Sequence, residues 1–169
     1  MSSEDGIIGT IEIDVTGFFT THHYLRAEWG DLGELTFRAF NQGATYEALD
    51  GRKVVMQKSH WLGTAHEMVD GGVVRGRADR PGLLRTDIAL QFDGQDYILE
   101  REGLLKQGWF LLDSERHILM EIQPRGVFTQ GAYLSLHAAV ELDLVAFAYY
   151  MVHMRKQEDA AVVAATSAS

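Results

Sequence analysis

The stretch Leu142–Met154, LDLVAFAYYMVHM, decides the fold of this 169-residue chain. Between Asp143 and His153 lie nine consecutive uncharged and mostly apolar residues, so the segment has no charged face over more than two helical turns. A helix that is apolar all round belongs either in a protein core or in a bilayer. Thirteen residues span roughly 20 Å as a helix, well short of the ~30 Å hydrocarbon core of a membrane. The sequence therefore predicts a buried helix and no transmembrane span.

Charged residues mark both ends of this helix. Glu141 and Asp143 lie where the positive end of the helix dipole would be, with Asp143 as a candidate N-cap, and Arg155 and Lys156 lie at the negative end. We therefore expect the helix to span about residues 142–156. The alanine-rich tail, residues 158–169, is expected either to extend the helix into solvent or to fray.

The chain before the helix has the pattern of strands and tight turns. Ile7–Val15 alternates between apolar and polar residues, as a half-buried strand does. Asp-Gly turns at Asp50-Gly51, Asp70-Gly71-Gly72 and Asp93-Gly94 each separate two such segments, and they predict hairpins because the primed turns need positive φ. A weaker turn follows at Asp113–Arg116. The turns recur about every twenty residues without a repeat in sequence, which indicates a β-meander.

These segments add up to about twelve strands and one helix in a single domain, residues 1–157. An open sheet of that size would expose two edges, and closing it removes them. Its interior would be too wide for side chains alone to fill, since barrels of about eight strands are near that limit. A six-residue strand is about 20 Å long, as is the apolar helix. We therefore predict a mainly β fold, an antiparallel closed barrel of about twelve strands that encloses one hydrophobic C-terminal helix.

Composition narrows the function classes. The chain has no cysteine, which excludes disulfides, cysteine-ligated metals and thiol catalysis. Its net charge is −9, and residues 1–50 hold nine acids against two bases, so a nucleic-acid partner is not expected. The first residues lack the basic start and apolar run of a secretion signal, so we expect a cytoplasmic location.

The chain resembles the tubby C-terminal-like superfamily, which includes the LURP-one-related proteins and the phospholipid scramblases. The resemblance extends from about Gly33 to Gln157. It is based on the meander with its Asp-Gly turns, on WFLLD at Trp109–Asp113 and HILM at His117–Met120, and on the terminal helix Leu142–Met154. It implies a twelve-stranded barrel around a central hydrophobic helix. It also implies a binding function more than catalysis, since tubby proteins bind phosphoinositides and scramblases act at membranes.

The family's usual lipid-binding features are sparse in this sequence. No calcium loop, no cysteine for palmitoylation and no dense basic cluster is present. The nearest candidate for an anion site is a group of four arginines. Arg75 and Arg77 would share one face of a strand, and Arg80 and Arg85 flank the Pro81-Gly82 turn, so that a phosphate could lie between them. A solvated strand face and loop is the alternative interpretation of the same residues.

Other patterns do not indicate a site. The seven histidines have neither helical i,i+4 spacing nor neighbouring carboxylates at ligand spacing, so we expect no metal and no cofactor. Ser59-His60 and Ser135-Leu136-His137 are not on a nucleophile elbow. His153 and the hydroxyls of Tyr149 and Tyr150 need hydrogen-bond partners if they are enclosed, and we interpret them as structural polar groups at the barrel mouth.

Three functions remain. The first is a non-enzymatic binding module that docks a protein or an anionic lipid head group on the barrel surface. The second is a carrier of a small apolar ligand in a barrel cavity. The third is an enzyme with an unrecognised site. The position of the helix distinguishes the first two, because a helix inside the barrel occupies the space that a carrier needs.

Overall fold

The computed structural model describes residues 6–39, 43–60, 62–79, 86–103, 106–126 and 130–168. These residues form twelve strands followed by one helix. The elements are β1 (Ile7–Thr16), β2 (Thr20–Ala27), β3 (Gly30–Arg38), β4 (Gly43–Ala48), β5 (Lys53–Lys58), β6 (His66–Asp70), β7 (Val73–Asp79), β8 (Ile88–Phe92), β9 (Gln95–Arg101), β10 (Trp109–Leu112), β11 (Ile118–Pro124), β12 (Ala132–Val140) and α1 (Leu142–Ser167).

The strands close into a barrel in which each strand pairs antiparallel with its neighbours in sequence, and β1 pairs with β12 to complete the ring. The closing register places Ile11 opposite Leu134 and Ile13 opposite Ala132, and all four side chains are buried. The closed antiparallel meander with one C-terminal helix confirms the predicted fold class. The Asp-Gly turns at residues 50, 70 and 93 join strands as expected, with positive φ at the glycines.

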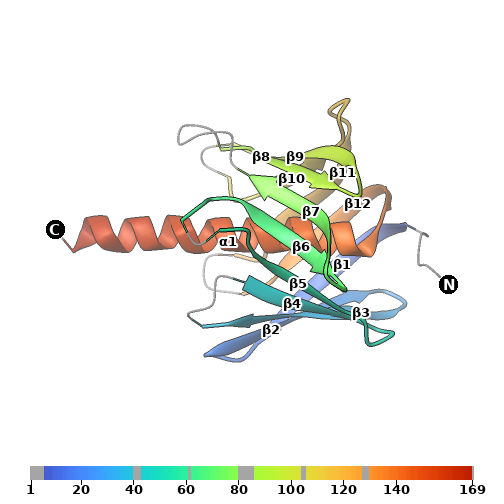
Figure 1. The fold of residues 1–169 in the computed structure, drawn as a ribbon, viewed down its shortest axis with the longest axis horizontal. Coiled ribbons are helices and arrows are strands. Elements are labelled where there is room, and N and C mark those ends of the chain that lie inside the picture. Colours follow the sequence, from blue (N-terminus) through green and yellow to red (C-terminus); the bar gives the residue numbers. More distant parts are fainter. Residues whose placement is uncertain are drawn as a thin grey trace.

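Helix α1 occupies the barrel interior. It runs through the ring of strands and its C-terminal part projects beyond them (Figure 1). Every residue from Asp143 to Val152 is buried, so the apolar segment has no solvent-facing side. One strand comes so close that it needs a glycine: a Cβ at Gly76 in β7 would lie 2.8 Å from Cε1 of Phe147. The helix, and not a cavity, fills this barrel.

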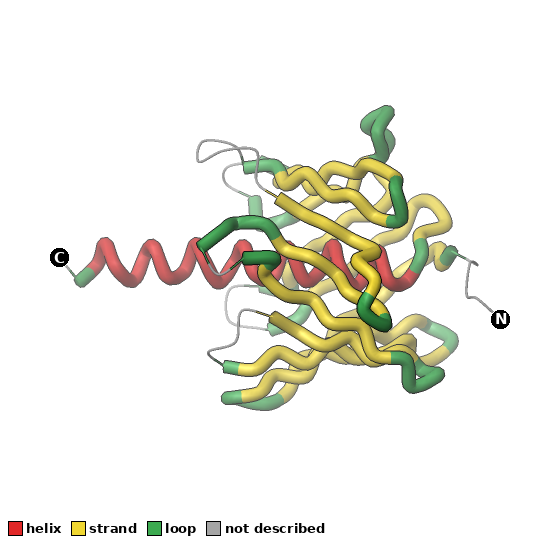
Figure 2. Tube along the Cα trace, in the orientation of Figure 1, coloured by secondary structure: helices red, strands yellow, loops and turns green. Residues whose placement is uncertain are grey.

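The two ends of the barrel differ. We call the end at which α1 begins the turn end; the short connections β2–β3, β4–β5, β6–β7, β8–β9 and β10–β11 lie there. The end from which α1 emerges is the loop end, and it holds the connections β1–β2, β3–β4, β5–β6, β7–β8, β9–β10 and β11–β12. Figure 2 shows the strands around α1, with the C-terminal part of the helix projecting beyond them. Successive antiparallel strands run in opposite directions, so successive connections of a meander lie at opposite ends of the barrel.

The helix continues to Ser167, so residues 158–167 extend it, which is one of the two outcomes expected for the tail. Two details differ from expectation. The N-cap of the helix is Glu141, which makes no side-chain capping hydrogen bond, while Asp143 lies in the first turn. The segment Phe18–Ala27 is rich in Phe, Thr, His and Tyr, which predicts a strand from Phe18 onward, but Phe18 and Phe19 belong to the β1–β2 turn and β2 begins at Thr20. Among the described residues, no helix combines the length and the apolarity needed to cross a membrane.

Candidate functional site

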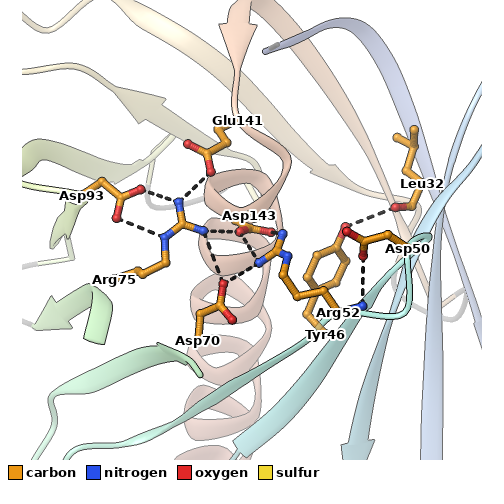
Figure 3. A network of polar contacts seen from close by, with 9 residues as sticks. All are labelled: Leu32, Tyr46, Asp50, Arg52, Asp70, Arg75, Asp93, Glu141 and Asp143. Carbon is orange, nitrogen blue, oxygen red and sulfur yellow. Dashed lines mark hydrogen bonds and ion pairs between the residues drawn. The ribbon is translucent and has the colours of Figure 1, made fainter. Parts of the chain in front are cut away.

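The turn end holds a cluster of ion pairs around the start of α1 (Figure 3). Asp143 is 3% exposed and accepts two hydrogen bonds from Arg52, from Nη1 to Oδ2 and from Nη2 to Oδ1, both at 2.8 Å. Arg52 Nη1 also donates to Asp70 at 2.8 Å. The hydrogen bond to Asp143 raises the pKa of Arg52, so this arginine is a permanent cation. The guanidinium of Arg52 thus donates two charge-assisted hydrogen bonds to this carboxylate. A buried charge needs such a partner to offset the loss of hydration.

Arg75 completes this cluster from the opposite side. Val74 pairs with Val69 and Gly76 pairs with Met68, which leaves Arg75 as the extra residue of a β-bulge. Bulges redirect side chains at barrel rims. The guanidinium donates to Asp143, to Asp93 and, at 2.7 Å, to Glu141. Its hydrogen bonds, first of all to Asp93, raise the pKa of Arg75.

The four arginines of the predicted anion site have different surroundings. Arg75 already forms ion pairs with four carboxylates, so an anion there would have to displace at least one of them. Arg77 is exposed, and both residues border an open hollow of about 480 Å³ over β7 and β8 together with Asp93. Arg80 and Arg85 lie outside the described residues. Anion binding by this group stays a prediction.

The loop end presents apolar side chains to solvent. Phe18 and Phe19 are 87% and 72% exposed in the β1–β2 turn, and their rings meet edge to face with centroids 5.1 Å apart. Leu62 in the β5–β6 connection and Val162 and Val163 on the projecting part of α1 are also exposed. Gly17 begins the turn with φ of +92°, and a Cβ there would lie 2.0 Å from the carbonyl oxygen of Thr20. Glycine at this position therefore allows the tight turn in which the rings of Phe18 and Phe19 are exposed.

Aromatic and imidazole rings pack beneath this apolar surface. His23 of β2 is 2% exposed, and its Nδ1 lies 2.8 Å from the hydroxyl of Tyr149 on α1. Nδ1 of His66 on β6 lies 2.8 Å from the hydroxyl of Tyr150. The two tyrosines that α1 buries therefore find partners on the barrel wall. These contacts fix the rotation of the helix inside the barrel.

Charge is distributed unequally between the ends. At the turn end, the residues between elements include six acids, Glu28, Asp50, Asp93, Asp113, Glu115 and Glu141, against the bases Arg52 and Arg116. At the loop end, the described connecting residues include two acids, Asp87 and Glu102, and two bases, Lys106 and Arg125. Among the described connecting residues, the excess of acids over bases therefore lies at the turn end.

The histidines do not converge on a metal-binding geometry in the part of the chain that the structure describes. No three side chains from histidine, aspartate and glutamate are close enough together there to hold an ion. His23 and His153 lie near each other, with ring centroids 4.8 Å apart, but they pack against aromatic rings and not against carboxylates. The chemistry of this region is therefore apolar contact and neutral hydrogen bonding.

Comparison with known proteins establishes the fold alone. No protein-family model and no curated protein sequence matches this chain. Among solved structures, the chain is similar to the crystal structure of a protein from Arabidopsis thaliana, with a TM-score of 0.62 and 8% sequence identity. The match covers 90% of this chain and 94% of the Arabidopsis chain. The barrel with its helix is therefore an architecture that a very different sequence can also form.

Proposed function

We propose that this protein is a non-enzymatic binding module that docks an apolar face of another protein through the loop end of its barrel. The observation that supports this most directly is the exposed pair Phe18 and Phe19. Large aromatic side chains are enriched at the centres of protein interfaces, where they contribute most of the binding energy. Two of them are in contact at the tip of one turn, and Leu62, Val162 and Val163 are exposed at the same end, so the loop end offers several apolar side chains for a partner to bury.

Charge favours a protein over an anionic membrane as the partner. An anionic lipid surface attracts proteins through clusters of unpaired lysine and arginine. This chain carries a net charge of −9, and Arg75, one of the four arginines in its nearest candidate cluster, is paired with carboxylates. A negatively charged surface would repel the acidic turn end most, so the protein would approach it with the loop end first. The net negative charge of the chain would still oppose binding. The lipid partner implied by the resemblance to tubby-like proteins is therefore our second choice.

The helix also bears on the carrier hypothesis. A carrier barrel needs an interior cavity, and here residues 143–152 of α1 are all buried within the ring of strands. Binding is therefore expected at the outside of the barrel and at its mouth.

A double substitution tests the docking surface. Proteins that the wild-type chain retains would be purified, and their dissociation constants measured for the wild type and for Phe18→Ser/Phe19→Ser. Loss of two aromatic anchors should weaken binding at least about thirtyfold, equivalent to ~2 kcal/mol. Trp29→Ser is the matched control, because Trp29 is also exposed but lies at the turn end.

Two outcomes would overturn the proposal. A purified partner that binds the double variant as tightly as the wild type would exclude the aromatic turn as the docking surface. Flotation of the wild type with acidic liposomes, lost in the double variant, would instead assign the same surface to a membrane.

A further inference from the structure

A pocket of about 300 Å³ opens at the loop end, beside the place where α1 leaves the barrel. Its apolar walls come from both ends of the sequence: Val15 of β1, Ile122 of β11, Ala132 of β12 and Val152 of α1. A volume of 300 Å³ is at the small end of ligand-binding pockets and equals roughly ten water-sized groups at ~30 Å³ each. The pocket is therefore suited to a small molecule with an apolar body.

The polar groups inside the pocket are neutral. Burial lowers the pKa of His23 to about 3, and its Nδ1 and Nε2 lie 2.8 and 3.1 Å from the Tyr149 and Thr21 hydroxyls. Burial also lowers the pKa of His153 to about 4. Nε2 of His153 lies 3.1 Å from the Gln157 amide, and its Nδ1 makes no hydrogen bond with any residue that the structure describes.

Lys156 is the one cation among the described residues that line the pocket. His153, Lys156, Gln157 and Ala160 all line the pocket, and their spacing of three, four and seven residues puts them on one face of α1. Lys156 is exposed, and it forms no ion pair within the described part of the chain. Its neighbours Arg155 and Glu158 pair with each other instead. The rim therefore combines one unpaired ammonium with an amide that can donate hydrogen bonds.

We propose that this pocket binds a small amphipathic monocarboxylate. The apolar body lies among Val15, Ile122 and Ala132, and the carboxylate lies at the rim between Lys156 and Gln157. One cation matches one negative charge, whereas a phosphate would call for several forked donors such as arginines. This site is independent of the docking surface at Phe18 and Phe19, because neither ring lines it.

Octanoate is a suitable probe, because its ten non-hydrogen atoms match the volume of the pocket. Titration into the purified full chain should show saturable one-to-one binding, with the methyl NMR shifts concentrated at the pocket residues Val15, Ile122, Ala132 and Val152. Ala160→Phe places a ring in the mouth of the pocket from an exposed helix position, so it should abolish binding while the fold is kept. Octanol, which lacks the charge, should bind more weakly.

Charge variants test the rim. Lys156→Gln should weaken octanoate about three- to fivefold, the size of effect expected for a partly exposed ion pair. Lys58→Gln removes the same charge from the same end of the barrel but outside the pocket, so it should leave affinity unchanged. Phe18→Ser/Phe19→Ser should also bind octanoate normally, which separates this proposal from the docking function.

Three results would overturn the proposal. The pocket would not be a binding site if octanoate failed to saturate at millimolar concentration, or if Ala160→Phe bound it as well as the wild type. Equal affinity for octanol, or equal losses in Lys156→Gln and Lys58→Gln, would exclude recognition of the carboxylate at the rim.

Discussion

His23 and His153 show how burial at the loop end fixes the protonation state of single residues. Both rings are packed among aromatic side chains, with the His153 ring 4.4 Å from Phe37 and the His23 ring 4.6 Å from it. Burial lowers the pKa of each, to about 3 for His23 and about 4 for His153, and each histidine is further disfavoured as a cation by its neighbours. Both are therefore neutral at pH 7 in the folded protein.

The difference between the folded and unfolded pKa values of these two histidines makes the stability of the protein depend on pH. In the unfolded chain both histidines titrate near pH 6.5, so between about pH 6.5 and 4 the unfolded state binds more protons than the folded state, and stability falls as pH falls. From pH 7 to 5 we expect a loss of roughly 1 to 2 kcal/mol for each histidine. Denaturant unfolding of wild type and of His153→Gln at both pH values measures this loss, and the variant should lose less.

His137→Gln serves as the control, because His137 is exposed and contacts only Glu121 among the described side chains. If His153→Gln and His137→Gln had the same pH dependence as the wild type, burial would not be holding His153 neutral.

The position of Arg75 could not be predicted from its neighbours in sequence. Alternation along Val73–Asp79 places Arg75 and Arg77 on one face, and that expectation holds only in a regular strand. The bulge changes the direction of the Arg75 side chain, which then contacts the start of α1. The bulge itself depends on the register between β6 and β7. Phe18 is a similar case, since its strand-like composition does not reveal that Gly17 has already begun a turn.

At the scale of elements, α1 is fixed by different interactions at its two ends. At the turn end the carboxylate of Asp143 is bound by Arg52 and Arg75. Near the loop end Tyr149 and Tyr150 are bound by histidines of β2 and β6. Between them the helix makes only apolar contacts with the barrel. The length and position of the helix were predictable because its apolar run is local in sequence, but its polar contacts are made with distant strands.

Asp143→Asn tests the attachment at the turn end. The substitution keeps the shape of the side chain but removes the charge that two arginines share, and breaking a buried pair typically costs 3–5 kcal/mol. Arg52 and Arg75 retain Asp70, Asp93 and Glu141, so we expect a smaller loss of about 2 to 4 kcal/mol in the free energy of unfolding. Chemical denaturation measures it.

Glu47→Gln provides the comparison, because it removes a carboxylate from an exposed pair with Lys53. It should cost less than about 1 kcal/mol. Equal losses in the two variants would mean that the cluster around Asp143 contributes no more than a surface ion pair.

At the scale of the whole molecule, a filled barrel leaves its ends and outer surface for binding. The closed meander was predictable from the Asp-Gly turns and from the need to bury an apolar helix, because both arguments use local pattern and length. The loop-end site was not, since it brings together residues 15–23, 122–132 and 149–160, which only ring closure makes neighbours. No local pattern marks a surface built in this way.

Hydrogen–deuterium exchange along α1 tests the central claim most directly, because the claim is that one helix is core in its first part and surface in its second. Amides of residues 145–152 are enclosed by the barrel and should exchange only through global unfolding, whereas those of residues 160–167 lie on the exposed projection and should exchange rapidly through local opening. Equally rapid exchange in both segments would contradict this account, because a helix that opens so easily cannot fill the barrel, and the interior would then be available to a carried ligand.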